Sequence, residues 1–183
     1  QLGHPFTLDQ PGVLSRLGGE VSAYTLEPLG IDYPRSEPQA LFDAARQAMK
    51  RWAAASPEAR LGVCMEIIER LHGRIFESAQ AVQHTSGQSA PMSYTGSGTN
   101  ALDRGVEALA YAQAAMADVP REALWERQFG STAIRLRKRY TLVPRGVAVC
   151  FTCATFPTWN AYPSMLASLA TGNAVVVKPH PAA

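Results

Sequence analysis

The stretch "GVAVCFTCATFPTWNAYPSMLASLATGNAVVVKP", residues 146–179, restricts the fold more than any other part of the chain. It contains two short apolar runs, residues 147–151 and 174–177, on either side of a segment of helical character. Gly172 and Asn173 end that segment with residues suited to a left-handed helix cap. Short, continuous apolar runs are typical of strands buried on both faces of a parallel sheet. The order therefore predicts one βαβ unit of an α/β fold.

A βαβ unit of this kind is stable only when further strands and helices cover its faces and edges. Residues 145–183 supply one such unit and no more. We therefore expect the chain to be part of a longer protein, with an incomplete sheet at its carboxyl end.

Two amphipathic helices are predicted between Ser36 and Ile75. The first has apolar residues at three- and four-residue steps, with Ser36 as its cap and an end near Ala55. Ser56 and Pro57 begin the second helix. Its expected buried stripe consists of Leu61, Cys64, Ile67, Ile68, Leu71 and Ile75. We interpret Cys64 as an ordinary core residue.

The residues before the βαβ unit fall into three parts that differ in amino-acid composition and pattern. Residues 1–35 are rich in glycine and proline, which predicts an extended arm. Residues 36–130 form a helical part, in which a loop at 84–100 leads into a third helix at 101–117 and a linker at 118–130 follows. Residues 131–144 alternate polar and apolar side chains, as a half-exposed strand does.

Composition limits the classes of partner and compartment. Apolar residues make up 46% of the chain and the net charge is +2, without a basic run that favours nucleic acid or an anionic membrane surface as a partner. No apolar run approaches the ~18 residues of a membrane span. Three cysteines make an odd count, which argues against a disulfide framework. We expect a cytoplasmic protein.

The sequence "CFTC" places Cys150 and Cys153 in a Cys-x-x-Cys pattern. In redox enzymes this pattern begins a helix, whose dipole lowers a thiol pKa. Here it ends an apolar strand, and no second Cys or His pair accompanies it. We interpret both residues as core cysteines, and an independent redox or metal protein is the alternative.

Two other motifs have an ordinary interpretation beside a functional one. Gly96 and Gly98 resemble part of a phosphate loop, but no strand precedes them and no Lys-Ser/Thr follows, so a flexible loop is favoured. Arg135, Arg137 and Arg139 share one strand face. They could bind phosphates, guard the strand against aggregation or contact a partner subunit, and we favour the last two.

Lys178 lies at the predicted carboxyl end of a buried parallel strand, followed by His180 and Pro181. Ligands bind at this edge of open α/β sheets, so the Lys178 ammonium could donate to ribose hydroxyls or to a phosphate. A solvated lysine without a ligand is the alternative.

From Arg145 onward, the pattern "PRGVAV…FP…SLATGNAVVVKP" resembles the aldehyde dehydrogenase superfamily. The paired helices and "HTSGQ" before it also agree with that family. The resemblance implies the amino-terminal part of a Rossmann-type cofactor domain, with preceding helices and an oligomerisation-type strand at 131–144. "AVQHTSGQ", "DRGVEALAYA" and "KPHP" are most similar to the subgroup that acts in phenylacetic acid degradation.

The resemblance implies roles for the turn after the first strand. Counting back from Gly172 and Asn173 aligns Thr155 with the family's oxyanion-holding asparagine, a role its hydroxyl could take. Asn160 is thereby excluded from that role and falls on the helix that lines the substrate tunnel. Four residues are implied to lie under the nicotinamide side of the cofactor: Phe151, Thr152, Cys153 and Ala154.

The resemblance also bears on the cofactor, NADP or NAD. Lys178 matches the family's adenosine-ribose lysine, and Pro181 stands where many NAD-preferring members have a glutamate. A carboxylate there accepts from the ribose hydroxyls and repels a 2′-phosphate. With Pro181 in its place and His180 adjacent, we predict that NADP is tolerated or preferred.

The implied parent is an NAD(P)-dependent aldehyde dehydrogenase that oxidises a semialdehyde, formed by ring opening of a CoA thioester in phenylacetate degradation. The family's catalytic cysteine and glutamate lie downstream of the Lys-Pro strand end, so we expect them beyond this chain. We expect at least a homodimer, formed by pairing the strand at 131–144 across subunits. A non-catalytic nucleotide-binding or interaction fragment is the alternative.

Overall fold

The computed structural model describes residues 3–4 and 6–181. Its strands form three pairs: β1 (Val13–Leu17) with β2 (Tyr33–Ser36), β3 (Glu122–Phe129) with β4 (Thr132–Arg139), and β5 (Val147–Phe151) with β6 (Ala174–Lys178). The helices are α1 (Pro38–Ala54), α2 (Pro57–His72), α3 (Ile75–Ser86), α4 (Ala90–Tyr94), the π-helix η1 (Thr95–Thr99), α5 (Asn100–Ala117) and α6 (Pro157–Ala170). None of the helices in the described ranges is long and apolar enough to cross a bilayer.

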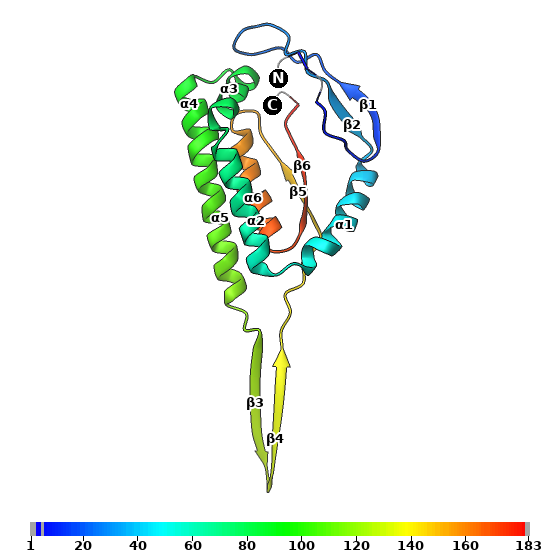
Figure 1. The fold of residues 1–183 in the computed structure, drawn as a ribbon, viewed down its shortest axis with the longest axis vertical. Coiled ribbons are helices and arrows are strands. Elements are labelled where there is room, and N and C mark those ends of the chain that lie inside the picture. Colours follow the sequence, from blue (N-terminus) through cyan, green and yellow to red (C-terminus); the bar gives the residue numbers. More distant parts are fainter. Residues whose placement is uncertain (1–2, 5, 182–183) are drawn as a thin grey trace.

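The predicted βαβ unit is confirmed. Strands β5 and β6 are parallel, with Val147 opposite Ala174 and Phe151 opposite Lys178, and α6 connects them. Gly172 has φ 90°, the left-handed conformation expected after α6. Helix α1 lies on one side of the strand pair and α6 on the other, with α2 and α5 beyond α6 (Figure 1).

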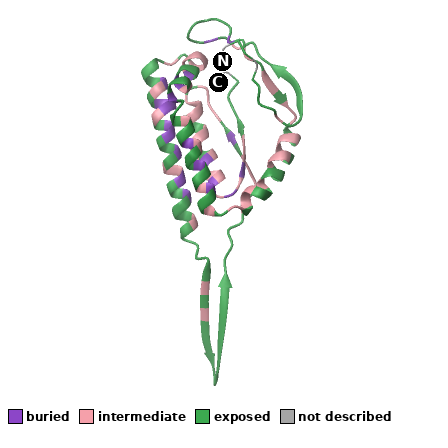
Figure 2. Ribbon diagram, viewed as in Figure 1, coloured by how far each residue is buried: buried purple, intermediate pink, exposed green. Residues whose placement is uncertain are grey.

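The hydrophobic core lies between α2, α5 and α6, where the buried residues gather in Figure 2. Cys64 and Leu166 are both 0% exposed, which confirms Cys64 as a core residue. Burial raises the pKa of the Cys64 thiol, so it stays protonated at neutral pH. Gly105 lets α5 approach α6 closely, since a Cβ there would lie 2.7 Å from Leu166 Cδ1.

The helix starts are only partly as predicted. Ser56 caps α2, with its Oγ accepting a hydrogen bond from the Ala59 amide at 3.1 Å. The predicted cap of the first helix is wrong, because Ser36 ends β2 and Glu37 takes its place. The Glu37 carboxylate accepts from the Ala40 amide at 2.7 Å, and Pro38 sets the first helical φ.

The predicted second helix is wrong beyond residue 72. Helix α2 ends at His72, and Ile75 begins α3 while still contributing to the same core. The loop predicted at 84–100 is confined to residues 87–89, because the other residues complete α3, form α4 and η1, and begin α5. Ser93 and Ser97 are 0% and 1% exposed, so tertiary packing determines their conformation against their loop propensity.

The prediction of a linker at 118–130 is wrong as well. Strand β3 pairs with β4 over its whole length, and Gly130, with φ 57°, makes the turn between them. The helical part assigned to residues 36–130 therefore ends in a strand. This hairpin projects away from the rest of the molecule (Figure 1).

Three other predicted segments can be compared with the structure. The arm predicted at 1–35 contains β1 and most of β2, which pair antiparallel. Helix α5, at Asn100–Ala117, confirms the third predicted helix. The strand predicted at 131–144 is β4, which ends at Arg139.

Candidate functional site at the carboxyl edge of β5 and β6

The carboxyl ends of β5 and β6 bring together residues that are 26 to 28 positions apart in the sequence. The Thr152 amide donates to the Lys178 carbonyl at 3.1 Å, and the His180 amide donates to Thr152 Oγ1 at 3.2 Å. Lys178, His180 and Pro181 are exposed beside the turn that follows β5. Two predicted groups of site residues, 151–154 and 178–181, thus share one edge of the strand pair.

The turn after β5 is organised around Cys153. Its amide donates to Asn160 Oδ1 at 3.2 Å, and its Sγ accepts from the Phe156 amide at 3.3 Å. Thr155 Oγ1 lies 3.4 Å from the same sulfur. The Thr155 hydroxyl, followed by the Phe156 amide, lowers the pKa of the Cys153 thiol. Cys153 is only half-buried, so its interpretation as a core cysteine is wrong.

Cys150 behaves differently from its neighbour in the Cys-x-x-Cys pattern. It is buried, as predicted, and its Sγ accepts from Ser164 Oγ at 3.1 Å. Both thiols are free. Within the described part of the chain, no group of three or more His, Cys, Asp or Glu residues is arranged to hold a metal ion.

Thr155 lies in the turn before α6, and Asn160 lies in the first turn of that helix. Thr155 is exposed, and its hydroxyl is engaged with Cys153 Sγ. Asn160, in the first turns of α6, points its carboxamide oxygen back at the Cys153 amide. Their roles as oxyanion donor and tunnel residue stay predictions.

Sequence reasoning missed the residues that hold this turn from the other side. Gln88 Nε2 donates to the Thr155 carbonyl at 2.5 Å, and Thr158 Oγ1 donates to the Ser97 carbonyl at 2.5 Å. Gly96 lies against the Phe156 ring, where a Cβ would meet Cε1 at 2.5 Å. The run of small residues at 95–99 was the available signal, because small residues allow close packing as well as loops.

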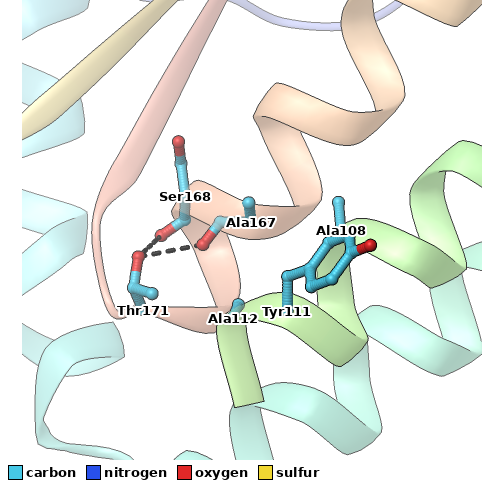
Figure 3. Close-up of a pocket in the computed structure, with 6 residues that line it drawn as sticks. All are labelled: Ala108, Tyr111, Ala112, Ala167, Ser168 and Thr171. Carbon is cyan, nitrogen blue, oxygen red and sulfur yellow. Dashed lines mark hydrogen bonds between the residues drawn. The ribbon is translucent and has the colours of Figure 1, made fainter. Parts of the chain in front are cut away.

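A separate groove of about 490 Å³ lies at the far end of α6 (Figure 3). It is lined by Ala108, Tyr111, Ala112, Ala167, Ser168 and Thr171. The Thr171 hydroxyl is already used, since it donates to the Ala167 and Ser168 carbonyls at 2.9 and 3.1 Å. Because the lining residues belong to α5 and to the carboxyl end of α6, the groove is separate from the edge where the predicted site residues meet.

Comparisons with known proteins agree with this architecture. A family model described as "Aldehyde dehydrogenase family" matches residues 32–183. No curated protein matches the chain significantly. The solved structure of an NAD-dependent aldehyde dehydrogenase from Burkholderia multivorans is 46% identical, with a TM-score of 0.94, over 100% of this chain and 33% of that one.

More distant structures share the fold alone. A mutant of aldehyde dehydrogenase C from Pseudomonas syringae, in complex with NAD+ and octanal, is 22% identical with a TM-score of 0.69, over 99% of this chain and 34% of that one. An NAD-dependent benzaldehyde dehydrogenase from Corynebacterium glutamicum is 19% identical with a TM-score of 0.68, over 93% and 36% of the two chains. The chain thus spans about a third of the length of these relatives. The predicted α/β fold class is confirmed.

Proposed function

The chain belongs to the aldehyde dehydrogenase family, and from that membership we propose that it is part of an NAD(P)-dependent aldehyde dehydrogenase. In this proposal, β5, α6 and β6 form the first βαβ unit of the cofactor-binding sheet. The observation that carries it is the shared edge where Thr152, Lys178 and His180 meet. Ligands of open α/β sheets bind at the carboxyl ends of the strands, and this edge is such an end.

The exposed end of β6 is the proposed binding place of the adenosine half of the cofactor. Lys178 offers an ammonium that can donate to the ribose hydroxyls. His180 and Pro181 carry no carboxylate that would repel a 2′-phosphate. We therefore propose that the enzyme uses NADP or NAD and that NADP is at least tolerated. The Burkholderia multivorans relative, described as NAD-dependent, supports use of NAD.

The turn after β5 is the proposed neighbour of the nicotinamide and of the aldehyde. Phe151, Thr152, Cys153 and Ala154 would lie under the nicotinamide side. Thr155 would donate a hydrogen bond to the oxygen of the reacting aldehyde, and Asn160 would face the substrate tunnel. The bound cofactor would accept the hydride. The nucleophilic cysteine and the glutamate that activates water would come from the remainder of the enzyme.

The proposed substrate is a semialdehyde that arises by ring opening of a CoA thioester in phenylacetate degradation, in the cytoplasm. The segments "AVQHTSGQ" and "DRGVEALAYA" support this choice through their similarity to that subgroup. We expect the full-length enzyme to reduce NADP or NAD when a semialdehyde is supplied, as measured at 340 nm. Cofactor binding without turnover of any aldehyde would favour the non-catalytic alternative.

Replacing Lys178 with alanine tests the adenosine site. We expect Lys178→Ala in the full-length enzyme to raise the dissociation constant of the cofactor about tenfold, because one hydrogen bond from a charged donor is worth ~1.5 kcal/mol or more. Turnover at saturating cofactor should change less than twofold. Lys50→Ala, which removes an exposed lysine from α1, is the matched control. Equal affinities for the two variants would contradict the assignment.

The β3–β4 hairpin is the proposed contact with a second copy of the chain. On one face, Arg135 pairs with Glu126 at 2.9 Å, while Arg137 and Arg139 pair with Glu122 at 3.7 and 3.4 Å. These arginines therefore have carboxylate partners without a phosphate. The other face carries five apolar residues and, beside them, Arg127, Thr132 and Lys138. The apolar residues are Ala123, Trp125, Phe129, Ile134 and Leu136, with the last three 48%, 41% and 48% exposed. We propose that this face and the free edge of β4 form at least a dimer.

A charge on the apolar hairpin face should dissociate the assembly. We expect Trp125→Glu to shift the full-length enzyme from dimer or larger to monomer in sedimentation velocity, because the largest apolar side chain of this face would be replaced by a carboxylate that must lose its hydration in the contact. Leu124→Glu, on the opposite, charged face, should leave the assembly intact. If wild-type enzyme sediments as a monomer, the proposed contact is wrong.

A further inference from the structure

One segment, residues 88–97, makes three contacts with the start of α6 and the turn before it. Its contacts fall on three nearby positions: Gln88 holds the Thr155 carbonyl, Gly96 lies under the Phe156 ring, and the Ser97 carbonyl accepts from Thr158. The partners in each contact are about 60 residues or more apart in the sequence. Residues 155–158 are thus held against a separate part of the chain.

Local structure explains how the segment reaches the turn. Helix α3 ends at Ser86, and the following Gly87, with a φ of 72°, reverses the chain direction so that Gln88 points toward the turn. The π-helix η1 then brings Gly96 to the Phe156 ring at a distance that excludes any side chain. Short π-helical insertions are frequent at functional sites.

The segment also contains buried polar side-chain atoms that do not contribute to the stability of the packing. Among the described residues, Gln88 Oε1, Ser93 Oγ and Ser97 Oγ are buried without a hydrogen-bond partner. Such atoms are few in native proteins, and apolar side chains of the same size would be more stable there. Departures of this kind are expected where a segment serves a site as well as the fold.

We infer that Gln88 is a positioning residue for the reaction, which fixes the Thr155 peptide and thereby aims the Thr155 hydroxyl. The inference rests on the proposed function. The Thr155 carbonyl and the Phe156 amide belong to one planar peptide unit, so the hydrogen bond from Gln88 also fixes the amide that donates to Cys153 Sγ. That sulfur in turn contacts the Thr155 hydroxyl. Catalytic groups displaced by about 1 Å can lose as much as ~100-fold in rate.

The test compares Gln88→Leu with wild type in the full-length enzyme. We expect the single-turnover rate of NAD(P)H formation to fall about tenfold, while the cofactor dissociation constant and the melting temperature change little. Gln88→Lys keeps a donor of sufficient length and should recover most of the rate. Gln80→Leu removes an exposed glutamine from α3 and should behave as wild type.

A second readout does not depend on catalysis. The pH midpoint of Cys153 alkylation, followed by peptide mass spectrometry, should move upward in Gln88→Leu, because the Thr155 hydroxyl and Phe156 amide that favour the thiolate lose their fixed geometry. An enzyme that turns over no aldehyde would refute the proposed function and, with it, a role of Gln88 in the reaction; the alkylation shift would then show only that Gln88 holds the turn that contains Cys153 and Thr155. An unchanged midpoint together with a single-turnover rate within twofold of wild type would overturn the inference.

Discussion

Replacing Arg60 with alanine is expected to lower the free energy of unfolding by about 3 kcal/mol. Arg60 is 6% exposed and donates to three carbonyls, those of Ala170 at 3.0 Å, Ala53 at 3.3 Å and Ala55 at 2.5 Å. These carbonyls lie at or just beyond the carboxyl ends of α1 and α6, where no helical amide is available to them. One guanidinium thus joins two helix ends and compensates the negative end of each dipole.

The size of the effect follows from two opposing terms. Each hydrogen bond to a charged group contributes ~1.5–3 kcal/mol, and removing the donor leaves buried carbonyls unpaired. Relief of the desolvation of the buried charge offsets part of that loss. For a chain of this size, ~3 kcal/mol corresponds to about 6–12 °C in melting temperature.

Arg70 is the matched control for this measurement, because it lies on the same helix α2. Its side chain is 79% exposed and forms an ion pair with Glu66 at 2.7 Å. Exposed pairs of this type contribute ~0.5 kcal/mol or less, so Arg70→Ala should change the melting temperature by about 2 °C at most. Equal shifts for the two variants would show that Arg60 does not hold the helix ends together.

Leu166→Ala should destabilise the protein by a similar amount, about 3 kcal/mol. Leu166 is fully buried between α2 and α5, and truncation of a buried leucine costs ~2–5 kcal/mol, depending on the cavity that remains. Chemical denaturation of the purified protein measures the loss. Leu166→Met conserves volume and should cost less than ~1.5 kcal/mol.

A double-mutant cycle with Gly105 makes this prediction stricter. In the wild-type background, an added Cβ at position 105 would lie 2.7 Å from Leu166 Cδ1, so Gly105→Ala should be unfavourable or neutral. In the Leu166→Ala background, the same methyl group fills part of the cavity and adds helix propensity, so it should stabilise. Additive effects of the two substitutions would contradict the close approach of α5 and α6.

The features that the sequence predicted correctly are those with a local cause. Ser56 caps α2 through its own neighbour, and Gly172 adopts a conformation that few other residues adopt at low cost. The apolar runs of β5 and β6 predicted the parallel pair and thereby the meeting of Thr152 with Lys178 at one edge.

The features that the sequence did not predict depend on distant contacts. Residues 84–100 have loop composition, yet all except 87–89 are helical, and Ser93 and Ser97 within them are buried against other elements. Strand β3 is defined by its pairing with β4, which no pattern within residues 118–130 specifies. Gln88 and Thr155 are 67 positions apart in the sequence, so no local sequence pattern around either residue predicts their contact.

The core between α2, α5 and α6 has a consequence for how the chain folds during synthesis. Cys64 and Leu166 share that core but are about 100 residues apart, which takes about 5–20 s at ordinary rates of translation. Until α6 has left the ribosome, α5 lacks the helix against which it packs most extensively, and the core that both share with α2 stays incomplete. Since contacts of such separation form slowly and only after loop closure, the nascent chain stays open to chaperones and proteases during this interval.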